Sequence, residues 1–227
     1  MRKLLIAATL FVATQVNAQI KTPQASLKSE IDQAVGLTNV SVDYFRPAKK
    51  GRLVFGDLVP YGKMWRTGAN QNTVIEIDTD IEINGKNLPA GKYALYTLPK
   101  AESWDVIIYK TTDNWGLPQT WNESDVVMKT AVKPQTLNKD VEYFTIDVTP
   151  QNNEQGTIDI SWEKTIVHVP FKVPTHKIAM ESINSSINEN SKASDYYAAG
   201  VYLFTSNTDV KKALDYVNKS ITMQNGE

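Results

Sequence analysis

Apolar and polar residues alternate along short segments through most of the chain, which is the pattern of strands with one buried face. Residues 38–45, TNVSVDYF, show it most simply. Residues 88–98 and 104–109 carry apolar side chains on both faces, as expected of central strands. The same pattern predicts further strands at residues 73–78, 81–83, 125–132, 142–149, 157–162 and 165–172.

The order of these strands predicts the fold class. Many short strands with turn signals between them, and no helix-length pattern separating them, favour antiparallel pairing over a parallel α/β fold. We therefore predict a mainly β domain, an antiparallel β sandwich or flattened barrel, over residues 23–173. Residues 19–29 are polar and include Pro23, so we predict a loose lead-in there. A turn near Glu163 and Lys164 is expected to separate the last two strands.

After Pro174 the apolar residues recur at helical spacing. This predicts a short helical tail over residues 177–227, with helices at residues 177–188, 193–204 and 210–221. The last helix has an apolar stripe, and Thr208 or Asp209 is expected to cap its first turn. The stripe consists of Ala213, Leu214, Val217 and Ile221.

The first 18 residues have the features of a secretory signal peptide. Arg2 and Lys3 precede an uncharged, mostly apolar run at residues 4–12, and residues 16–18, VNA, offer a small-residue cleavage site. The apolar run is too short to span a membrane, and no later segment approaches the length of a span. We expect a periplasmic or secreted protein without a membrane span.

Composition narrows the function further. The 227 residues are 41% hydrophobic, enough for one domain of good size with a small appendage. Cysteine is absent, which excludes disulfides, thiolate catalysis, cysteine zinc sites and a lipid-modified cysteine. With a formal net charge of −1 the protein has no overall positive charge to attract nucleic acid, so we expect no nucleic-acid partner.

Residues 46–73, RPAKKGRLVFGDLVPYGKMWRTGANQNT, are the most distinctive stretch, with three arginines, one tryptophan and four glycines. Guanidinium groups are planar donors suited to carboxylate, phosphate or sulfate, and they stack on aromatic rings. We predict a binding site here for a small polar ligand, anionic or carbohydrate-like. Its expected residues are Arg46, Arg52, Trp65, Arg66 and Asn70.

A structural role for the same residues is the alternative. Arginines in glycine-rich loops often bind backbone carbonyls or a partly buried acid, here Asp43 or Asp57, and Asn70 is suited to capping a turn. Trp65 could form a sugar-stacking platform with Trp115 and Trp121, or it could plug one end of the sandwich.

Metal and catalytic motifs are not found. The acids at residues 78–82 have the alternate spacing of a calcium loop, but Ile83 stands where such a loop needs glycine. His168 and His176 are too few and too far apart in sequence for a histidine-based zinc site. We expect no metal and no cofactor, and no catalytic residue can be named. A glycan-directed hydrolase with paired carboxylates remains an alternative, with Glu76, Glu102, Asp105 and Glu142 available.

Four short motifs resemble a bacterial family called domain of unknown function 2911. They are RP at residues 46–47, KGR at residues 50–52, FGDLVPYGKMWRTGAN at residues 55–70 and AGKYAL at residues 90–95. The resemblance covers roughly residues 23–173 and implies a secreted bacterial protein, with no activity attached. In some members helical repeats follow the β domain.

The tail is similar to part of a tetratricopeptide unit. Residues 209–221, DVKKALDYVNKSI, resemble the second helix of such a unit, in which an alanine and large apolar residues pack on the first helix. This similarity implies a further alternative function, protein binding through the helical tail.

Overall fold

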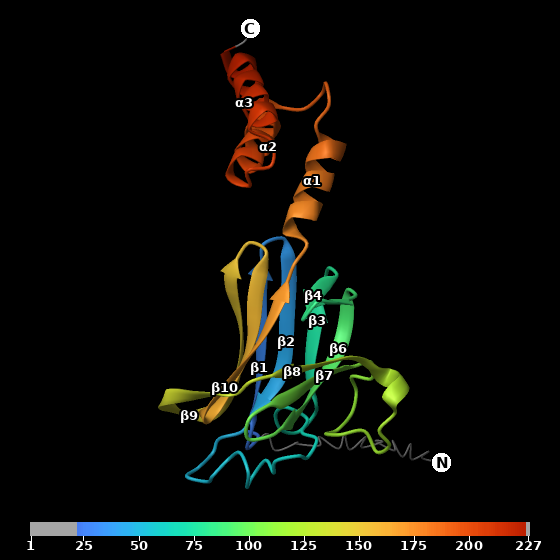
Figure 1. The fold of residues 1–227 in the computed structure, drawn as a ribbon, viewed down its shortest axis with the longest axis vertical. Helices are drawn as coiled ribbons and strands as arrows, with labels where there is room; N and C mark the ends of the chain where they lie inside the picture. The colour runs from blue at the N-terminus through green and yellow to red at the C-terminus, as the bar shows by residue number, and fades with distance from the viewer. Residues whose placement is uncertain (1–21, 226–227) are drawn as a thin grey trace, which may run out of the picture.

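The computed structural model describes residues 22–225, which form a two-layer β sandwich followed by three helices (Figure 1). One sheet has the strand order β1-β2-β3-β6-β7-β8 and the other the order β5-β4-β10-β9, with antiparallel pairing throughout. The strands are β1 (Leu27–Val35), β2 (Thr38–Arg46), β3 (Thr73–Ile77), β4 (Ile81–Ile83), β5 (Lys86–Leu88), β6 (Gly91–Pro99), β7 (Trp104–Tyr109), β8 (Val126–Val132), β9 (Gln135–Asn152) and β10 (Gln155–Lys172).

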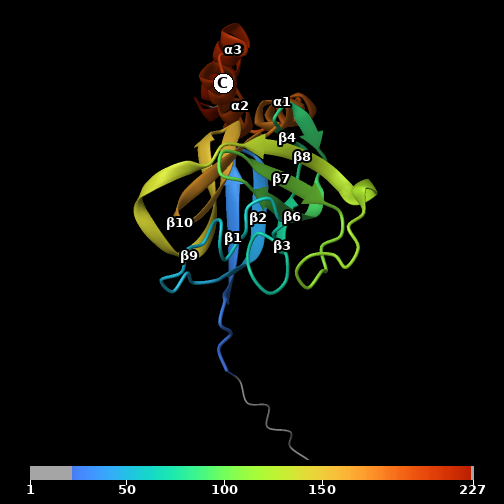
Figure 2. The ribbon, with the colours of Figure 1, turned by 60° about the horizontal axis from the view of Figure 1, so that its bottom comes forward.

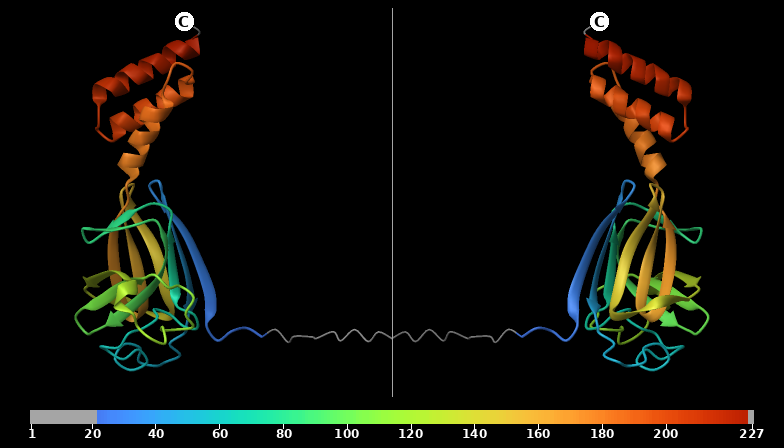
Figure 3. Two further views of the ribbon diagram at one scale, coloured as in Figure 1. Left: turned by 90° about the vertical axis from the view of Figure 1, so that its right-hand side faces the viewer. Right: turned by 90° about the vertical axis from the view of Figure 1, so that its left-hand side faces the viewer.

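The predicted antiparallel sandwich is confirmed, and the two sheets do not close into a barrel. Seen edge-on in Figure 3, the sheets form two layers. The inward faces of the strands bury the alternating apolar residues that the sequence pattern marks, and apolar burial of this kind supplies most of the driving force for folding. The buried core includes Val40, Val42, Ile75, Ile77, Ile146, Ile158 and Ile160.

Strand β1 was not predicted, and part of it falls in the expected lead-in. It starts at Leu27 and pairs with β2 along its whole length, from Leu27 opposite Arg46 to Val35 opposite Thr38. It is an edge strand, so it needs few apolar residues, and its sequence LKSEIDQAV alternates weakly. Polar edge strands of this kind leave little trace in a hydrophobicity pattern.

Strand β10 folds back on itself, as the predicted turn requires. Nine residues of extended chain span roughly 30 Å, yet Asp159 Oδ1 and His168 Nδ1 are 2.7 Å apart. Glu163 has a φ of 54°, the left-handed backbone that a tight reversal needs. The two predicted strands at residues 157–162 and 165–172 are therefore the two arms of β10.

The three helices are α1 (Thr175–Ser186), α2 (Ala193–Thr205) and α3 (Val210–Asn225), and they lie at one end of the sandwich (Figure 1). Helices α2 and α3 pack closely because Gly200 has no side chain: a Cβ there would lie 2.8 Å from Val217 Cγ2. Asp209 Oδ1 accepts a hydrogen bond from Lys212 N at 2.9 Å, the cap predicted from sequence. The tetratricopeptide likeness of this pair stays a prediction.

Helix α2 exposes an apolar stripe to solvent. Tyr197, Val201 and Phe204 lie four and three residues apart, on one face of the helix, and all are exposed. Protein binding through the helical tail stays a prediction. Within residues 22–225, the helices are too short or too polar to cross a membrane.

Thr175, the first residue of α1, attaches the helices to the sandwich. It is buried, and its hydroxyl donates to the carbonyl of Asn153 in the β9–β10 turn. The same oxygen accepts a hydrogen bond from Leu37 N, in the β1–β2 turn, at 3.3 Å. Thr175 thus ties the start of α1 to two turns of the sandwich.

The two sheets are joined at one corner by the chain that follows β2. Phe144 N of β9 donates to Pro47 O at 2.9 Å, and Lys49 N donates to Glu142 O at 2.8 Å. The side chain of Arg46 reinforces this junction, with Nε donating to Phe144 O at 3.1 Å and Nη2 to Thr145 Oγ1 at 2.8 Å. Arg46 thus links a strand of one sheet to a strand of the other.

We expect a chain of residues 22–177, which keeps Thr175, to unfold cooperatively with a stability close to that of the whole protein. A chain of residues 22–174 should have a free energy of unfolding about 1 to 3 kcal/mol lower than that of the 22–177 chain, because it loses the two hydrogen bonds of the Thr175 hydroxyl to Leu37 N and Asn153 O. Urea unfolding of the two chains measures the difference. An unfolded 22–177 chain would show instead that the sandwich needs its helices.

Replacing Arg46 with alanine is expected to lower the free energy of unfolding by about 2 to 3 kcal/mol, because it removes a charged donor that bonds across the sheets. Arg52→Ala is the matched control. Arg52 bonds within its own loop, so its replacement should cost about 1 kcal/mol or less. Equal losses in urea unfolding would contradict the assigned role of Arg46.

Candidate functional site

The long connection between β2 and β3 lies at the end of the sandwich opposite the helices and faces the viewer in Figure 2. The backbone of Trp65 attaches the central part of this connection to β6. Trp65 N donates to Thr97 O at 2.7 Å, and Thr97 N donates to Trp65 O at 3.0 Å. Successive residues of an extended chain point to opposite sides. Trp65 therefore enters the space between the sheets, and Arg66 faces the outer side.

The Trp65 side chain is part of an aromatic cluster that plugs this end of the core. Its ring is stacked on Trp162, with centroids 6.1 Å apart and planes 17° apart, and it meets Phe144 edge-on at 5.0 Å. Its indole Nε1 donates to Gly68 O at 3.1 Å. Phe55 and Trp104 complete the cluster. Trp65 thus packs as the structural alternative describes, at one end of the sandwich core.

The backbone that follows Trp65 is held in an unusual conformation. Thr67 is fully buried and has a φ of 56°, a region that β-branched residues rarely occupy. Such a residue costs of order 1–3 kcal/mol and persists where its surroundings fix it. Here Thr67 O accepts from Thr73 Oγ1 at 2.5 Å, and the hydroxyls of Thr67 and Thr97 are 3.0 Å apart.

Two of the three arginines are occupied by hydrogen bonds within the protein. Arg46 bonds to β9 as described above. Arg52 Nε donates to Lys49 O at 2.8 Å, and its Nη2 donates to Ala48 O at 2.6 Å. Both residues therefore have the structural partners that arginines in glycine-rich loops commonly take.

Arg66 differs from the other two arginines. Within residues 22–225 its side chain has no hydrogen-bond acceptor and no acidic partner, and its Nε is buried without a partner. Its Nη1 lies against the loop that follows β7, because a Cβ on Gly116 would be 3.3 Å from it. A partly buried guanidinium that lacks an acceptor is unfavourable. An anion or other acceptor bound here would remove that cost.

A pocket of about 450 Å³ opens at this end of the sandwich. Arg52, Trp65 and Arg66 line it, with Lys50 and Trp162. Its other lining residues are Ala25, Ser26, Pro47, Ala48, Leu58, Val59, Gly68 and Ala69. Three cationic residues and no carboxylate in the described lining favour an anionic occupant.

Asn70 and Arg46 do not line this pocket. Asn70 has a φ of 55°, and its Nδ2 lies 3.3 Å from Gln24 Oε1 and 3.5 Å from Ser26 O. This geometry suits a residue that shapes a turn and holds the segment before β1. Because neither Asn70 nor Arg46 lines this pocket, a ligand-binding role for them stays a prediction.

The other tryptophans of the suggested sugar-stacking platform do not join Trp65. Trp121 packs on Tyr109 with ring centroids 4.5 Å apart, and its Nε1 donates to Glu123 Oε1 at 2.9 Å. Trp115 is 72% exposed and stands beside Gly116. Trp115 is therefore the one of the three whose ring is open to solvent.

Sequence reasoning missed a buried polar cluster beside Arg66. Asn72 is 3% exposed, its N donates to Asn114 O at 3.2 Å, and its Oδ1 is buried without a partner among the described residues. Asn114 Nδ2 in turn donates to the hydroxyl of Tyr96 at 3.3 Å. Burial raises the pKa of Tyr96 to about 12, so its hydroxyl stays neutral. No motif marks Asn72 in the sequence.

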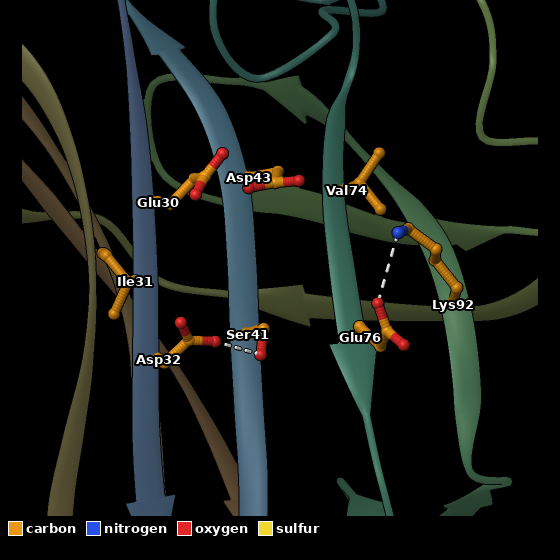
Figure 4. A pocket seen from close by; sticks show the side chains of 8 residues that line it. All are labelled: Glu30, Ile31, Asp32, Ser41, Asp43, Val74, Glu76 and Lys92. Carbon is orange, nitrogen blue, oxygen red and sulfur yellow. Dashed lines mark hydrogen bonds and ion pairs between the residues drawn. The ribbon is translucent and has the colours of Figure 1, made fainter.

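An acidic surface lies on the outward face of β1, β2 and β3 (Figure 4). Glu30 stands directly opposite Asp43 in the β1–β2 pair, and Glu76 is 3.2 Å from Lys92 Nζ. The carboxylates surround a shallow pocket of about 220 Å³. Lys28 lies 3.7 Å from Asp43 and also pairs with Glu30, so lysines of the same face offset part of the like-charge repulsion.

The two histidines make contacts within the protein. His168 Nδ1 bonds to Asp159 in β10, and His176 Nδ1 lies 3.1 Å from the hydroxyl of Tyr202 in α2. Within residues 22–225, no three histidine, aspartate or glutamate side chains are grouped to hold a metal ion. Asp105, one of the acids available to a hydrolase, is paired with Lys100 and Lys129.

The predicted signal peptide lies outside the described residues. No curated protein and no solved structure shows a significant match to the chain. A family model described as protein of unknown function (DUF2911) matches residues 26–171, which cover the sandwich and the loop that carries Arg66. The chain therefore belongs to the DUF2911 family.

Proposed function

We propose that this protein is a periplasmic or secreted binding module, and that the pocket lined by Arg52, Trp65 and Arg66 receives a small anionic or carbohydrate-like ligand. The observation that carries the proposal is the state of Arg66: a partly buried guanidinium without an acceptor among residues 22–225. Charged donors of this kind gain most from a charged acceptor, often through two parallel hydrogen bonds.

The pocket supports the same proposal. Lys50 and Arg52 add positive charge to the wall, and the described lining contributes no carboxylate to oppose an anion. Trp65, which is half-buried, supplies apolar surface to the same pocket, and Trp162 lies behind it at 2% exposure. A small ligand with one charged end and an apolar or ring-shaped body fits this combination.

The rigidity of the loop is a further support. The strained Thr67 follows Arg66 directly, and its position is fixed by hydrogen bonds to Thr73 and Thr97. Backbone strain of this kind is concentrated at ligand sites, where it pre-organises the binding groups. A pre-organised site loses less conformational entropy on binding.

Binding is favoured over glycan hydrolysis. A hydrolase of the paired-carboxylate type needs two acids facing each other across the site, roughly 5 to 9.5 Å apart. The described lining of this pocket contains neither aspartate nor glutamate. The proposed location follows from the signal-peptide pattern of residues 1–18.

Arg66→Gln should separate binding from folding. We expect the melting temperature of the wild-type protein to rise with at least one of acetate, sulfate, phosphate and D-glucuronate, and not with D-glucose. Arg66→Gln should weaken the affinity for the effective anion about 10- to 100-fold, because it removes the charged donor. Differential scanning fluorimetry and titration calorimetry measure the two effects.

Lys172→Gln is the matched control, because Lys172 is a surface cation on β10, outside this pocket. It should leave the anion affinity unchanged. The unliganded Arg66→Gln protein should melt close to wild type, since the lost side chain has no partner to leave behind. A large loss of stability in the unliganded variant, with anion affinity unaltered, would overturn the proposal.

A further inference from the structure

The connection between β2 and β3 exposes three large apolar side chains to solvent. Leu53 is 59% exposed, Leu58 38% and Tyr61 47%. Single exposed apolar residues are common on proteins, but a group of them on one surface marks an interaction site. This connection lies at the end of the sandwich farthest from the three helices (Figures 1 and 3).

The three side chains leave from one small loop. Leu58 N donates to Leu53 O at 3.3 Å, so the two leucines are neighbours where the chain reverses. Gly56, in this reversal, has a φ of 99°, and a Cβ there would lie 2.9 Å from Tyr61 Cε2. The ring of Tyr61 therefore packs on the loop that carries both leucines. We call Leu53, Leu58 and Tyr61 the apolar tip.

The loop is anchored in the core, which fixes the apolar tip in place. Val54, Phe55 and Val59 alternate with the exposed residues and are buried in the main hydrophobic cluster. Val59 N donates to Val54 O at 2.8 Å, and Val54 N donates to Glu163 Oε2 at 3.1 Å. Apolar side chains that stay hydrated add nothing to the driving force for folding. Their fixed presentation lowers the entropic cost of binding a partner.

Positive charge is concentrated in the same connection. Residues 46–73 carry six lysines and arginines and one acid, Asp57, whereas the whole chain has 24 basic and 25 acidic residues. Arg46 and Lys49 are used inside the protein, because Arg46 bonds across the sheets and Lys49 pairs with Asp140. Glu142 binds the backbone N of Lys50 and not its ammonium group. Three exposed cations that make no ion pair among residues 22–225 remain: Lys50, Arg52 and Lys63.

A second loop at this end adds exposed apolar residues. Trp115 is 72% exposed and Leu117 42%, on either side of Gly116. Gly116 lies against Arg66 of the β2–β3 connection, so the two loops are in contact. Tryptophan and tyrosine are the residues enriched at the level of lipid headgroups.

We propose that this end of the sandwich binds the surface of an anionic phospholipid bilayer. The apolar tip enters the boundary between headgroups and acyl chains, and Trp115 lies at the level of the headgroups. This inference does not rest on the proposed small-ligand site. The cations that contact the lipid phosphates are Lys50, Arg52 and Lys63.

The combination of residues favours a lipid surface over other partners. Protein interfaces are depleted of lysine, and in a symmetric pair of this chain the same cations of both copies would face each other. A polyanion such as an acidic polysaccharide needs the cations but gains little from exposed leucines. An anionic bilayer attracts both groups, because apolar side chains enter it while cations pair with its headgroups.

Vesicle flotation tests the proposal on residues 19–227, because the apolar run of the predicted signal peptide would itself bind lipid. We expect binding to phosphatidylcholine vesicles with about 30% phosphatidylglycerol to be at least about tenfold tighter than to phosphatidylcholine alone, since each cation near the surface adds about fivefold. About 0.5 M NaCl should remove most of this difference. A protein that binds neither vesicle, or binds both equally, would overturn the proposal.

Paired substitutions assign the binding to the apolar tip. Leu53→Ser/Leu58→Ser should weaken binding to the anionic vesicles at least about tenfold, because two apolar side chains no longer leave water. Val201→Ser/Phe204→Ser is the matched control, since these exposed residues of α2 lie at the opposite end, and it should change nothing. Equal effects of the two pairs, or no effect of the leucine pair, would contradict the inference.

The cations have a matched pair of their own. Lys50→Gln/Lys63→Gln should weaken binding to the anionic vesicles about 10- to 30-fold, because two charges near the headgroups are lost. Lys172→Gln/Lys211→Gln removes the same charge from β10 and α3 and should have no comparable effect. Equal losses in the two pairs would show a response to net charge and would reject the assigned surface.

Other occupants give different outcomes. Binding of polygalacturonate that survives Leu53→Ser/Leu58→Ser, without vesicle binding, would replace the bilayer with a polyanion. A dimer in sedimentation velocity that the same substitutions dissociate, again without vesicle binding, would replace it with a second copy. Arg66→Gln should keep most of the vesicle binding, because Arg66 is partly buried and outside the lipid contact. The small-ligand site and the lipid surface can therefore fail independently.

Discussion

The packing of Trp65 against Trp162 is the contact on which the geometry of the candidate site depends. A stacked pair at 6.1 Å, surrounded by Phe55, Phe144 and Trp104, ties an otherwise glycine-rich connection to the core between the sheets. Large aromatic side chains bury enough apolar area to offset the entropy of ordering such a segment. Because neighbouring residues of an extended chain face opposite ways, burying Trp65 inward directs Arg66 outward.

The three arginines of this connection have separate tasks. Arg46 bonds across the two sheets, and Arg52 holds the turn of its own loop through carbonyl oxygens. Arg66 has no comparable partner in the described part of the chain. The chemical versatility of the guanidinium group explains this division, since its donors serve backbone carbonyls as well as ligand anions.

The sandwich separates two regions of the molecule. The connection between β2 and β3, with the candidate site, occupies one end, and the three helices occupy the other (Figure 1). Thr175 links the helices to the β1–β2 and β9–β10 turns at their end of the sandwich. The family match covers the sandwich and the candidate site and stops at residue 171, before α1. The three helices lie outside the matched residues.

Sequence alone determined the fold class and most of the strands, because alternating burial leaves a period of two in the hydrophobicity pattern. The strand predicted at residues 104–109 has the bounds of β7, and the three predicted helices are all present. Strand β1 escaped prediction because an edge strand rich in charged residues has little alternation to detect.

Sequence also pointed to the segment of residues 46–73, since three arginines and four glycines in one connection are unusual. What it could not decide was which arginine is left for a ligand. That depends on carbonyls of Phe144 and Ala48 that reach Arg46 and Arg52 in the folded chain. Gly116 comes against Arg66 only through a tertiary contact, because its loop follows β7, about fifty residues further along the chain. Residue types are local information, whereas the satisfaction of a hydrogen-bonding group is a property of the whole packed structure.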